Sequence, residues 1–296
     1  MGAPLGFARR LMELPPEPVP DGTMLELPGR GGATFVSDNP GPTPDAPVVV
    51  LLHALATTGL LTWYPTISTL TKRYRVITLD QRSHGRGITQ GTFSLYDCAD
   101  DVAALLDAKG LEKAIIGGYS MGSIVAQRVW RQHRERVSGL VLAASTDRFM
   151  STTTEKLFHQ ATGAAMFGFR KPITARIADF GARRTAAGLG GEADLYEWAL
   201  EEMRRTSPLA VGQAVAALGR HHSRPWVSRI DVPTAVVVPT KDRVIPPERQ
   251  FALAARIPGA TVHEVHAGHA AVVLQAEEFV PVMAHALNTV QARIKS

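Results

Sequence analysis

The chain has 296 residues, 45% of them hydrophobic, with a single cysteine and a formal net charge of +5. This length and apolar content suit one large α/β domain or one domain that carries an insertion, and the lone Cys98 excludes an internal disulfide. The arginines are scattered and no basic stripe alternates with aromatic residues, so we expect no nucleic-acid partner.

The first 22 residues are rich in proline and lack periodicity, and we interpret them as an N-terminal extension. They contain no apolar run of signal-peptide length, and no stretch of the chain approaches the roughly 18 consecutive apolar residues of a membrane span. We therefore expect a soluble, cytoplasmic protein without a membrane span. The sequence leaves its oligomeric state open.

Apolar, β-branched runs recur along the chain after two β-forming segments at 23–28 and 32–38. These runs indicate buried strands at residues 47–53, 74–80, 114–120, 139–145, 234–240 and 260–266. Helical patterns separate them at about residues 61–72, 95–109, 121–134, 246–257 and 273–294. The alternation predicts an α/β fold whose mostly parallel sheet is covered by helices on both faces.

Residues 146–228 interrupt this alternation with four amphipathic segments and no strand pattern. We interpret them as a helical cap inserted between strands 6 and 7, which leaves residues 23–145 and 229–296 as the core. This position places the cap above the crevice at the carboxyl ends of the strands. Some of its aromatic and methionine side chains are therefore expected to line an apolar pocket.

One serine, Ser120, lies where the strand at 114–120 meets the next helix, between Gly118 and Gly122. A glycine-flanked serine on a tight strand-to-helix turn is typical of a nucleophile elbow, in which larger neighbours would collide as the helix packs over the strand. The turn exposes the hydroxyl beside a helix N-terminus, whose free N–H groups favour negative charge. Such serines also occur in ordinary turns, so the pentapeptide alone leaves both readings open.

Two further residues follow later strands in the chain order Ser, acid, His. Asp242 comes after the strand at 234–240, and His269 lies on the loop before the last helix. Because the carboxyl ends of parallel strands face one crevice, Asp242 can hold His269 while His269 takes the proton of Ser120. Asp147 is a second candidate for the acid, although its place at the start of the insertion favours an ordinary N-cap.

The segments GYSMG, PTKDRVIPP, AGHAAVV and LDQRSHGRG together resemble the α/β-hydrolase fold superfamily, over residues 23 to 294. The last of them is similar to the D-x-R-G-H-G-x-S loop of esterases, haloperoxidases and lactonases in this group. The resemblance implies a serine hydrolase of the esterase or lipase kind, with Ser120, Asp242 and His269 as its catalytic triad.

The family also has an H-G-x segment, matched here by His53-Ala54-Leu55. By this resemblance the main-chain N–H groups of Leu55 and Met121 form the oxyanion hole. Ala54 and Ser83 stand where the family usually has glycine, so a positive φ at either position would alter the local loop.

Several other residues invite a chemical role but have an ordinary explanation. His263 and His266 point to opposite faces of a strand, and no carboxylate or cysteine completes a ligand set, so we expect no metal. We interpret His53, His84 and Arg86 as structural, Cys98 as a small core residue, and His221-His222 as the exposed end of the insertion.

The sequence thus predicts a serine hydrolase that cleaves small-molecule carboxylic esters with a medium-size apolar part, through an acyl-enzyme and without a cofactor. Lactone or C–C bond hydrolysis, perhydrolysis and acyl transfer remain alternatives with the same triad, because a fold does not fix its chemistry. A further alternative is a ligand-binding module without catalysis.

Overall fold

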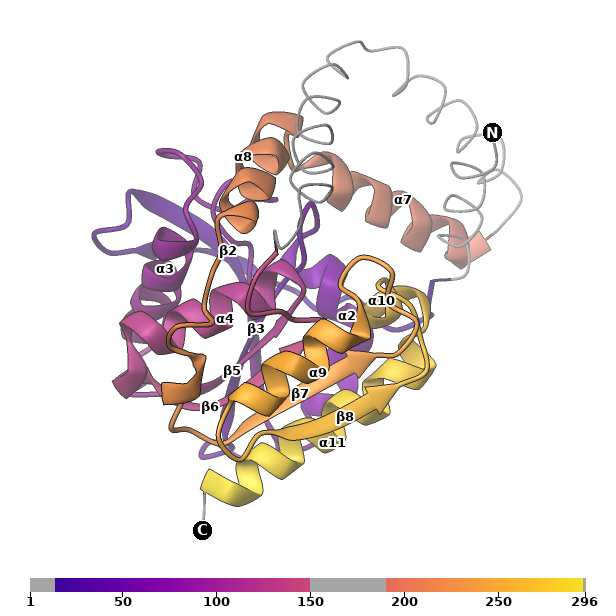
Figure 1. Ribbon diagram of the computed structural model, residues 1–296. Coiled ribbons are helices and arrows are strands. Elements are labelled where there is room, and N and C mark those ends of the chain that lie inside the picture. Colours follow the sequence, from indigo (N-terminus) through magenta and orange to yellow (C-terminus); the bar gives the residue numbers. More distant parts are fainter. Residues whose placement is uncertain (1–13, 150–189, 295–296) are drawn as a thin grey trace.

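An eight-stranded sheet forms the centre of the computed structural model, which describes residues 14–149 and 190–294 (Figure 1). The strands are β1 Thr23–Leu27, β2 Gly32–Asn39, β3 Val48–Leu52, β4 Arg75–Leu79, β5 Ala114–Tyr119, β6 Val137–Ala143, β7 Thr234–Pro239 and β8 Thr261–Val265. Their order in the sheet is β1-β2-β4-β3-β5-β6-β7-β8. The β1–β2 and β2–β4 pairs are antiparallel and all others are parallel, so the prediction of a mostly parallel sheet is confirmed.

Helices connect these strands. Their bounds are α2 Gly59–Leu70, α3 Leu95–Ala108, α4 Met121–Gln132, α7 Gly190–Arg204, α8 Pro208–Gly219, α9 Pro247–Arg256, α10 Ala271–Leu274 and α11 Ala276–Ile294, with short 3-10 turns at Arg134–Arg136 and Val227–Arg229. Side-chain caps explain three of the starts: Thr58 accepts the N–H of Leu61 at α2, Ser94 accepts that of Tyr96 at α3, and Ser207 accepts that of Ala210 at α8.

The last helix differs from the single segment expected at 273–294. The chain leaves the helical conformation at Gln275 (φ −140°, ψ 45°), which separates the short α10 from α11. The side-chain carbonyl of Gln275 accepts the N–H of Gly268 at 3.0 Å. This break therefore serves to tie the start of α11 to the loop that precedes α10, a tertiary contact that periodicity cannot reveal.

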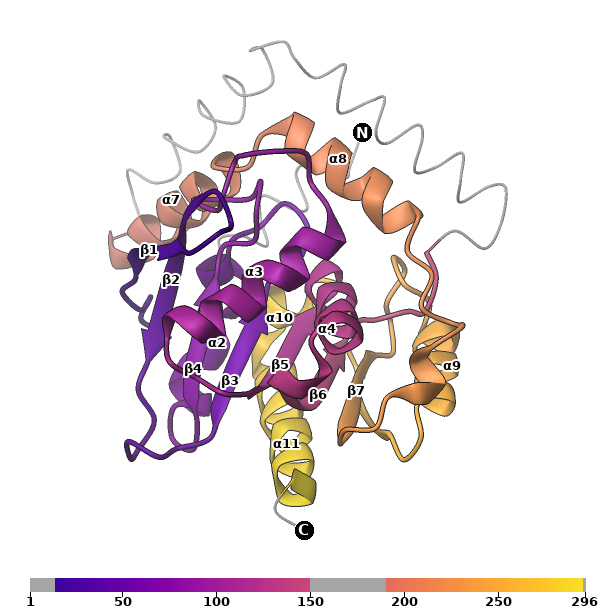
Figure 2. The same ribbon diagram turned by 90° about the vertical axis from the view of Figure 1, so that its left-hand side faces the viewer.

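Two apolar cores cover the two faces of the sheet, and alternate residues of the central strands supply them. In β3, Val50 and Leu52 belong to the core formed with α3, α4 and α9, whereas Val49 and Leu51 belong to the core formed with α2 and α11. Figure 2 shows α3 and α4 in front of the sheet and α11 behind it. Burial on both faces explains why these strands are continuous apolar runs rather than alternating ones.

The helices α7 and α8, which we call the insertion helices, come between β6 and β7 in the chain and lie above the carboxyl ends of the strands (Figure 1). Two of the four amphipathic segments of the expected cap coincide with them, and the other two, within residues 150–189, lie outside the described residues. His221, expected at an exposed end, is buried at 2% exposure, because it follows α8 directly into the core; its neighbour His222 is exposed.

Asp147 also differs from expectation. Its carboxylate faces the guanidinium groups of Arg256 and Arg224, at 3.5 and 3.9 Å, and within the described residues it begins no helix. The expected N-cap role is therefore not observed in the part of the chain that the structure describes. The carboxylate of Asp147 instead forms ion pairs with two arginines.

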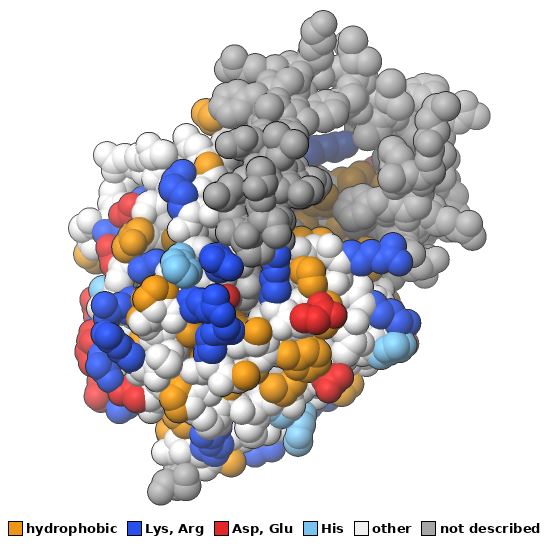
Figure 3. Space-filling model, in the orientation of Figure 1, with side chains coloured by type: hydrophobic (Ala, Val, Ile, Leu, Met, Phe, Trp, Pro, Cys, Tyr) orange, Lys and Arg blue, Asp and Glu red, His pale blue; other side chains and the backbone are white. Residues whose placement is uncertain are grey.

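The surface below the undescribed residues carries basic, acidic and apolar side chains in small interspersed groups (Figure 3). On this face no single basic stripe runs across the described elements. Among the described helices, none is long and apolar enough to cross a membrane.

Candidate active site

Ser120 occupies a strained turn between β5 and α4. Its backbone has φ 52° and ψ −115°, a conformation that residues with a side chain rarely adopt. The two flanking glycines make this turn possible. A Cβ on Gly118 would lie 2.2 Å from the carbonyl oxygen of Gly122, and one on Gly122 would lie 2.1 Å from that of Leu52. The backbone packing therefore requires glycine at both positions.

The three side chains predicted from the sequence meet at the carboxyl edge of the sheet. Nε2 of His269 lies 3.0 Å from Oγ of Ser120, and Nδ1 of His269 lies 2.7 Å from Oδ2 of Asp242. An ionised carboxylate only accepts hydrogen bonds, so Nδ1 carries the proton and Nε2 is left to accept the one from Ser120. Ser120 and Asp242 are buried, and the His269 side chain is 23% exposed.

Asp242 is fixed by hydrogen bonds on both of its oxygens. Oδ1 accepts the main-chain N–H groups of Val244 and Ile245 at 2.8 and 2.9 Å, while Oδ2 accepts from Gln250 at 3.3 Å in addition to His269. The carboxylate therefore cannot rotate away from the imidazole without losing several bonds.

Tyr119, the residue before the serine, supports the histidine. Its hydroxyl donates to the main-chain carbonyl of His269 at 2.8 Å. Burial, and next the nearby charge of Asp242, raise the pKa of the Tyr119 phenol, so the hydroxyl keeps its proton and remains a donor. Tyr119 thus contacts the main chain of His269, and Ser120 contacts its imidazole.

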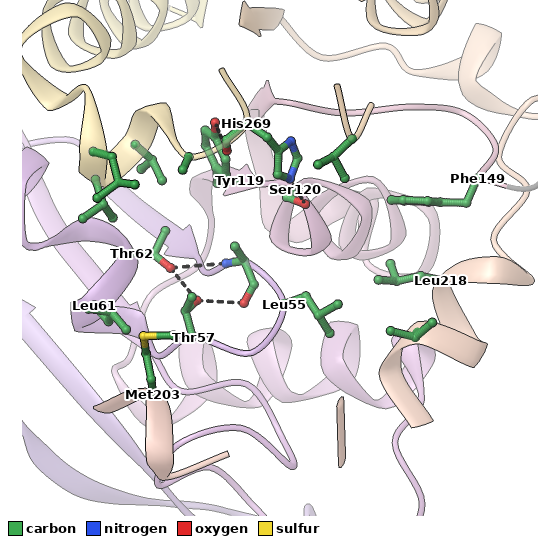
Figure 4. Close-up of a pocket in the computed structure, with 17 residues that line it drawn as sticks. Leu55, Thr57, Leu61, Thr62, Tyr119, Ser120, Phe149, Met203, Leu218 and His269 are labelled. Carbon is green, nitrogen blue, oxygen red and sulfur yellow. Dashed lines mark hydrogen bonds between the residues drawn. The ribbon is translucent and has the colours of Figure 1, made fainter. Parts of the chain in front are cut away.

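The loop after β3 is held by a network around Ala54. His53 is fully buried, and its Nε2 accepts the N–H of Gln81, so Nδ1 carries a proton and donates to the carbonyl of Ala54 at 2.7 Å. Burial, with the nearby His84, lowers the pKa of His53 to about 3, which keeps the ring neutral. The hydroxyl of Thr57 donates to the same carbonyl at 2.8 Å, and Thr62 accepts the N–H of Ala54 at 3.3 Å (Figure 4).

Leu55 and Met121 supply the two main-chain N–H groups expected to act as donors. Within the described residues, no hydrogen bond engages either group. Met121 is the first residue of α4, so its N–H is one of the four that an α-helix leaves unpaired. Leu55 lines the same cavity as Ser120 (Figure 4).

The two departures from the family pattern have different outcomes. Ser83 adopts φ 62°, so a serine there takes a left-handed conformation that glycine would adopt without strain. Ala54 is not in this region; the positive φ in the first loop falls two residues later, at Ala56 (φ 61°). The segment at 79–87 is otherwise held by the buried ion pair of Arg82 with Asp101, at 2.6 Å. His84 is buried, with its Nδ1 3.2 Å from the carbonyl oxygen of Arg82, and its purely structural role stays a prediction.

A cavity of about 370 Å³ opens beside Ser120 and His269 (Figure 4). Its described lining is largely apolar and comes from the core and from the insertion helices; the lining residues include Leu55, Leu61, Phe149, Met203, Val215 and Leu218. Phe149 and Met203 belong to the aromatic and methionine side chains of residues 146–228, some of which were expected to line such a pocket. An apolar cavity with one serine and one histidine at its wall suits an uncharged organic substrate.

Some residues of this site were not identified from the sequence. Thr57, Thr62 and Gln250 hold other residues of the site by hydrogen bonds, and no motif marks them. Tyr119 occupies a variable position of the elbow pentapeptide. Within the described residues, no group of three or more His, Cys, Asp or Glu side chains is arranged to hold a metal; that the protein uses no metal stays a prediction.

Comparisons with known proteins agree with the observed fold. The family model described as alpha/beta hydrolase fold matches residues 47–276. A relative from Yersinia enterocolitica that carries the name carbamate hydrolase is 27% identical over 253 residues, covering 80% of this chain and 86% of its own. The 3-oxoadipate enol-lactonase 1 of Acinetobacter baylyi is 25% identical, covering 90% and 98%.

Solved structures give the same fold. The enol-lactonase from Burkholderia xenovorans superposes with a TM-score of 0.73 at 22% identity, covering 90% of this chain and all of that one.

Proposed function

Because this chain belongs to the α/β-hydrolase fold family, we propose that it is a serine hydrolase that cleaves carboxylic esters through an acyl-enzyme. The observation that carries the proposal is the pair of hydrogen bonds joining Ser120 to His269 and His269 to Asp242. A serine hydroxyl is a weak nucleophile at neutral pH unless a base removes its proton, and this arrangement supplies that base.

In the first half of the reaction, Oγ of Ser120 attacks the ester carbonyl carbon while Nε2 of His269 takes the hydroxyl proton. The carbonyl oxygen becomes an oxyanion, which the N–H groups of Leu55 and Met121 stabilise by hydrogen bonding. Asp242 stabilises the imidazolium that forms. His269 then gives the proton to the leaving alcohol oxygen as the C–O bond breaks, which leaves an acyl group on Ser120.

In the second half, water enters beside His269, which takes one proton from it. The resulting hydroxide oxygen attacks the acyl carbonyl, and the oxyanion forms again between the same donors. When the bond to Oγ breaks, His269 returns the proton to Ser120. The acid product leaves and the free enzyme is restored.

The cavity favours a substrate with an apolar portion of medium size, since burial of each methylene adds about 0.8 kcal/mol of binding. Carbamates and lactones present the same kind of carbonyl, and the names of two relatives support these as second candidates. Attack by Ser120 and proton transfer by His269 would proceed in the same way on all three classes.

A single panel of substrates tests the proposal. Purified protein is assayed with p-nitrophenyl esters from acetate to palmitate, a p-nitrophenyl N-alkyl carbamate and a γ-lactone. We expect the highest kcat/KM for an ester of medium chain length. A higher value for the carbamate or the lactone would assign the activity to that class, and no turnover of any of them would contradict a hydrolytic function of this site.

A further inference from the structure

Glu202, on the insertion helix α7, is a buried carboxylate that the proposed reaction does not use. It is 2% exposed. Oε2 accepts the hydroxyl of Thr58 at 2.6 Å and a guanidinium N–H of Arg86 at 3.0 Å, while Oε1 accepts from Arg205 at 2.9 Å. A buried charge is tolerated only with such partners, and three donors on two oxygens fix the orientation of the carboxylate closely.

Thr58 connects this carboxylate to the loop that carries a proposed oxyanion donor. Thr58 is fully buried and caps helix α2, where its Oγ1 accepts the N–H of Leu61 at 3.1 Å. A hydroxyl has one proton, and Thr58 gives that proton to Glu202. The next residue, Gly59, donates its N–H to the buried carboxylate of Asp80 at 2.8 Å. The far end of the loop is thus held at Thr58 and Gly59.

Between Ala54 and these anchors lie Leu55, Ala56 and Thr57, and the hydroxyl of Thr57 itself belongs to the network around Ala54. Ala56 has φ 61°, a conformation that costs free energy and persists only where the surroundings hold it. A small displacement of Thr58 would therefore be taken up mainly by rotation of the peptide units of Leu55 and Ala56. The direction of the Leu55 N–H depends on both ends of the loop.

The same turn of α7 also contacts the cavity. Met203, the residue after Glu202, lines it together with Thr57 and Leu61 (Figure 4). Helix α7 therefore contributes Met203 to the wall of the cavity and Glu202 to the hydrogen bond with Thr58.

We propose that Glu202 is a positioning residue that holds the loop at residues 54–58 through Thr58, and so couples the insertion helix α7 to the oxyanion donor of Leu55. This inference rests on the proposed function for its effect on rate, but its structural content does not. The carboxylate touches no reacting atom; it acts by fixing where an N–H group points.

The test compares Glu202→Gln with Glu201→Gln, a control of equal charge change at the neighbouring side chain, which is 68% exposed. Glutamine has one acceptor oxygen in place of two, so it cannot satisfy Thr58, Arg86 and Arg205 together. We expect kcat on the preferred ester to fall about tenfold or more in Glu202→Gln, a smaller effect than the loss of a whole oxyanion donor, and to stay within twofold in Glu201→Gln.

A second readout reports on the donors themselves. Sulfur accepts hydrogen bonds weakly, so a well-formed hole favours an ester over the matching thionoester. We expect this ratio of rates to fall in Glu202→Gln and to be unchanged in Glu201→Gln. An unchanged ratio, with kcat within twofold of the parent, would overturn the proposal.

The amide resonance of Leu55 in ¹⁵N-labelled protein tests the coupling without any turnover. We expect it to shift or broaden in Glu202→Gln alone. If the parent hydrolyses no ester, the proposed function fails, but this measurement still tests the coupling between Glu202 and the Leu55 N–H. An unchanged Leu55 resonance in Glu202→Gln refutes that coupling even if the parent hydrolyses esters normally. Should Glu202→Gln fail to fold, Thr58→Val and Thr58→Ser replace it, with the loss expected in the valine variant and largely restored by serine.

Discussion

Oδ2 of Asp242 lies 2.7 Å from Nδ1 of His269, while its other oxygen accepts two main-chain N–H groups from the turn that follows β7. The loop that follows β7 therefore orients the carboxylate independently of its contact with the imidazole. This arrangement leaves the other ring nitrogen of His269 to face Ser120, which is the geometry that general-base catalysis needs.

The amide variant tests which acid orients the histidine. In Asp242→Asn the side chain can present an N–H to Nδ1, which favours the wrong tautomer, so ester turnover should fall by about 10³ to 10⁴-fold. Asp147→Asn loses only weak contacts to partly exposed arginines, and its activity should stay near that of the parent, with a stability change below about 1 kcal/mol. Steady-state kinetics and urea unfolding decide; the opposite ranking of the two variants would mean that Asp147 is the acid.

Gly122, the second glycine of the elbow, leaves no room for a side chain. In Gly122→Ala the new Cβ would lie 2.1 Å from the carbonyl oxygen of Leu52, so we expect a loss of about 3 kcal/mol in unfolding free energy. Gly110→Ala is the control, because Gly110 has φ 63° with no atom near its Cβ position, and backbone strain alone costs about 1 kcal/mol. Equal losses in the two variants would show that overlap with Leu52 is relieved by a shift of α4.

Buried histidines should make the fold sensitive to acid. Burial lowers the pKa of His53 and His221 to about 3 and that of His84 to about 4. Below the ordinary pKa of about 6.5 the unfolded chain binds protons that the folded chain does not, so stability is present above pH 6.5 and falls as the pH decreases toward 4. Each such histidine contributes about 1.4 kcal/mol per pH unit in that window.

Urea unfolding at several pH values checks this. In His84→Gln, the slope of unfolding free energy against pH should decrease by about 1.4 kcal/mol per pH unit, which corresponds to one proton. In His222→Gln, which changes an exposed side chain, the slope should not change. A parent protein equally stable at pH 7 and pH 4.5 would contradict the low pKa values.

Filling the cavity should shift the preferred chain length. Each buried methylene adds about 0.8 kcal/mol, so kcat/KM is expected to rise about fourfold per methylene from acetate until the pocket is full. Leu218→Trp, on the wall contributed by α8, should lower kcat/KM for octanoate at least tenfold more than for acetate. A parent that prefers acetate would show that the cavity does not receive the acyl chain.

The positions of the strands and the three central side chains followed from the sequence, because apolar runs mark buried parallel strands and the functional residues come directly after them. GYSMG and PTKDRVIPP are local segments, and their order along the chain together with their resemblance to the family's motifs identified Ser120 and Asp242. The supports of the site could not be predicted in this way. Thr62 accepts the N–H of Ala54, eight residues earlier, only because helix α2 returns it to that loop. Glu202 is 144 residues from Thr58 in the chain, and the two become adjacent only after α7 has packed.

Two errors have the same origin. His221 was expected to be exposed because it lies in a polar stretch, yet the chain turns inward after α8 and buries it. At the break in the last helix, the side chain of Gln275 accepts the N–H of Gly268, a contact that helical periodicity does not encode. Both features involve the path of the chain just beyond a helix, which helical periodicity does not report.

The most direct measurement of the central claim is covalent labelling by a fluorophosphonate at neutral pH, followed by mass spectrometry of the digested protein. Phosphorus takes the place of the acyl carbon, so only a serine whose proton is removed by a neighbouring base reacts quickly. We expect one equivalent of label on the peptide that contains Ser120, no label in Ser120→Ala, and ester turnover lowered by about 10⁴-fold or more in that variant. Folded parent protein that takes up no label, or a Ser120→Ala variant that keeps activity within tenfold of the parent, would contradict the account.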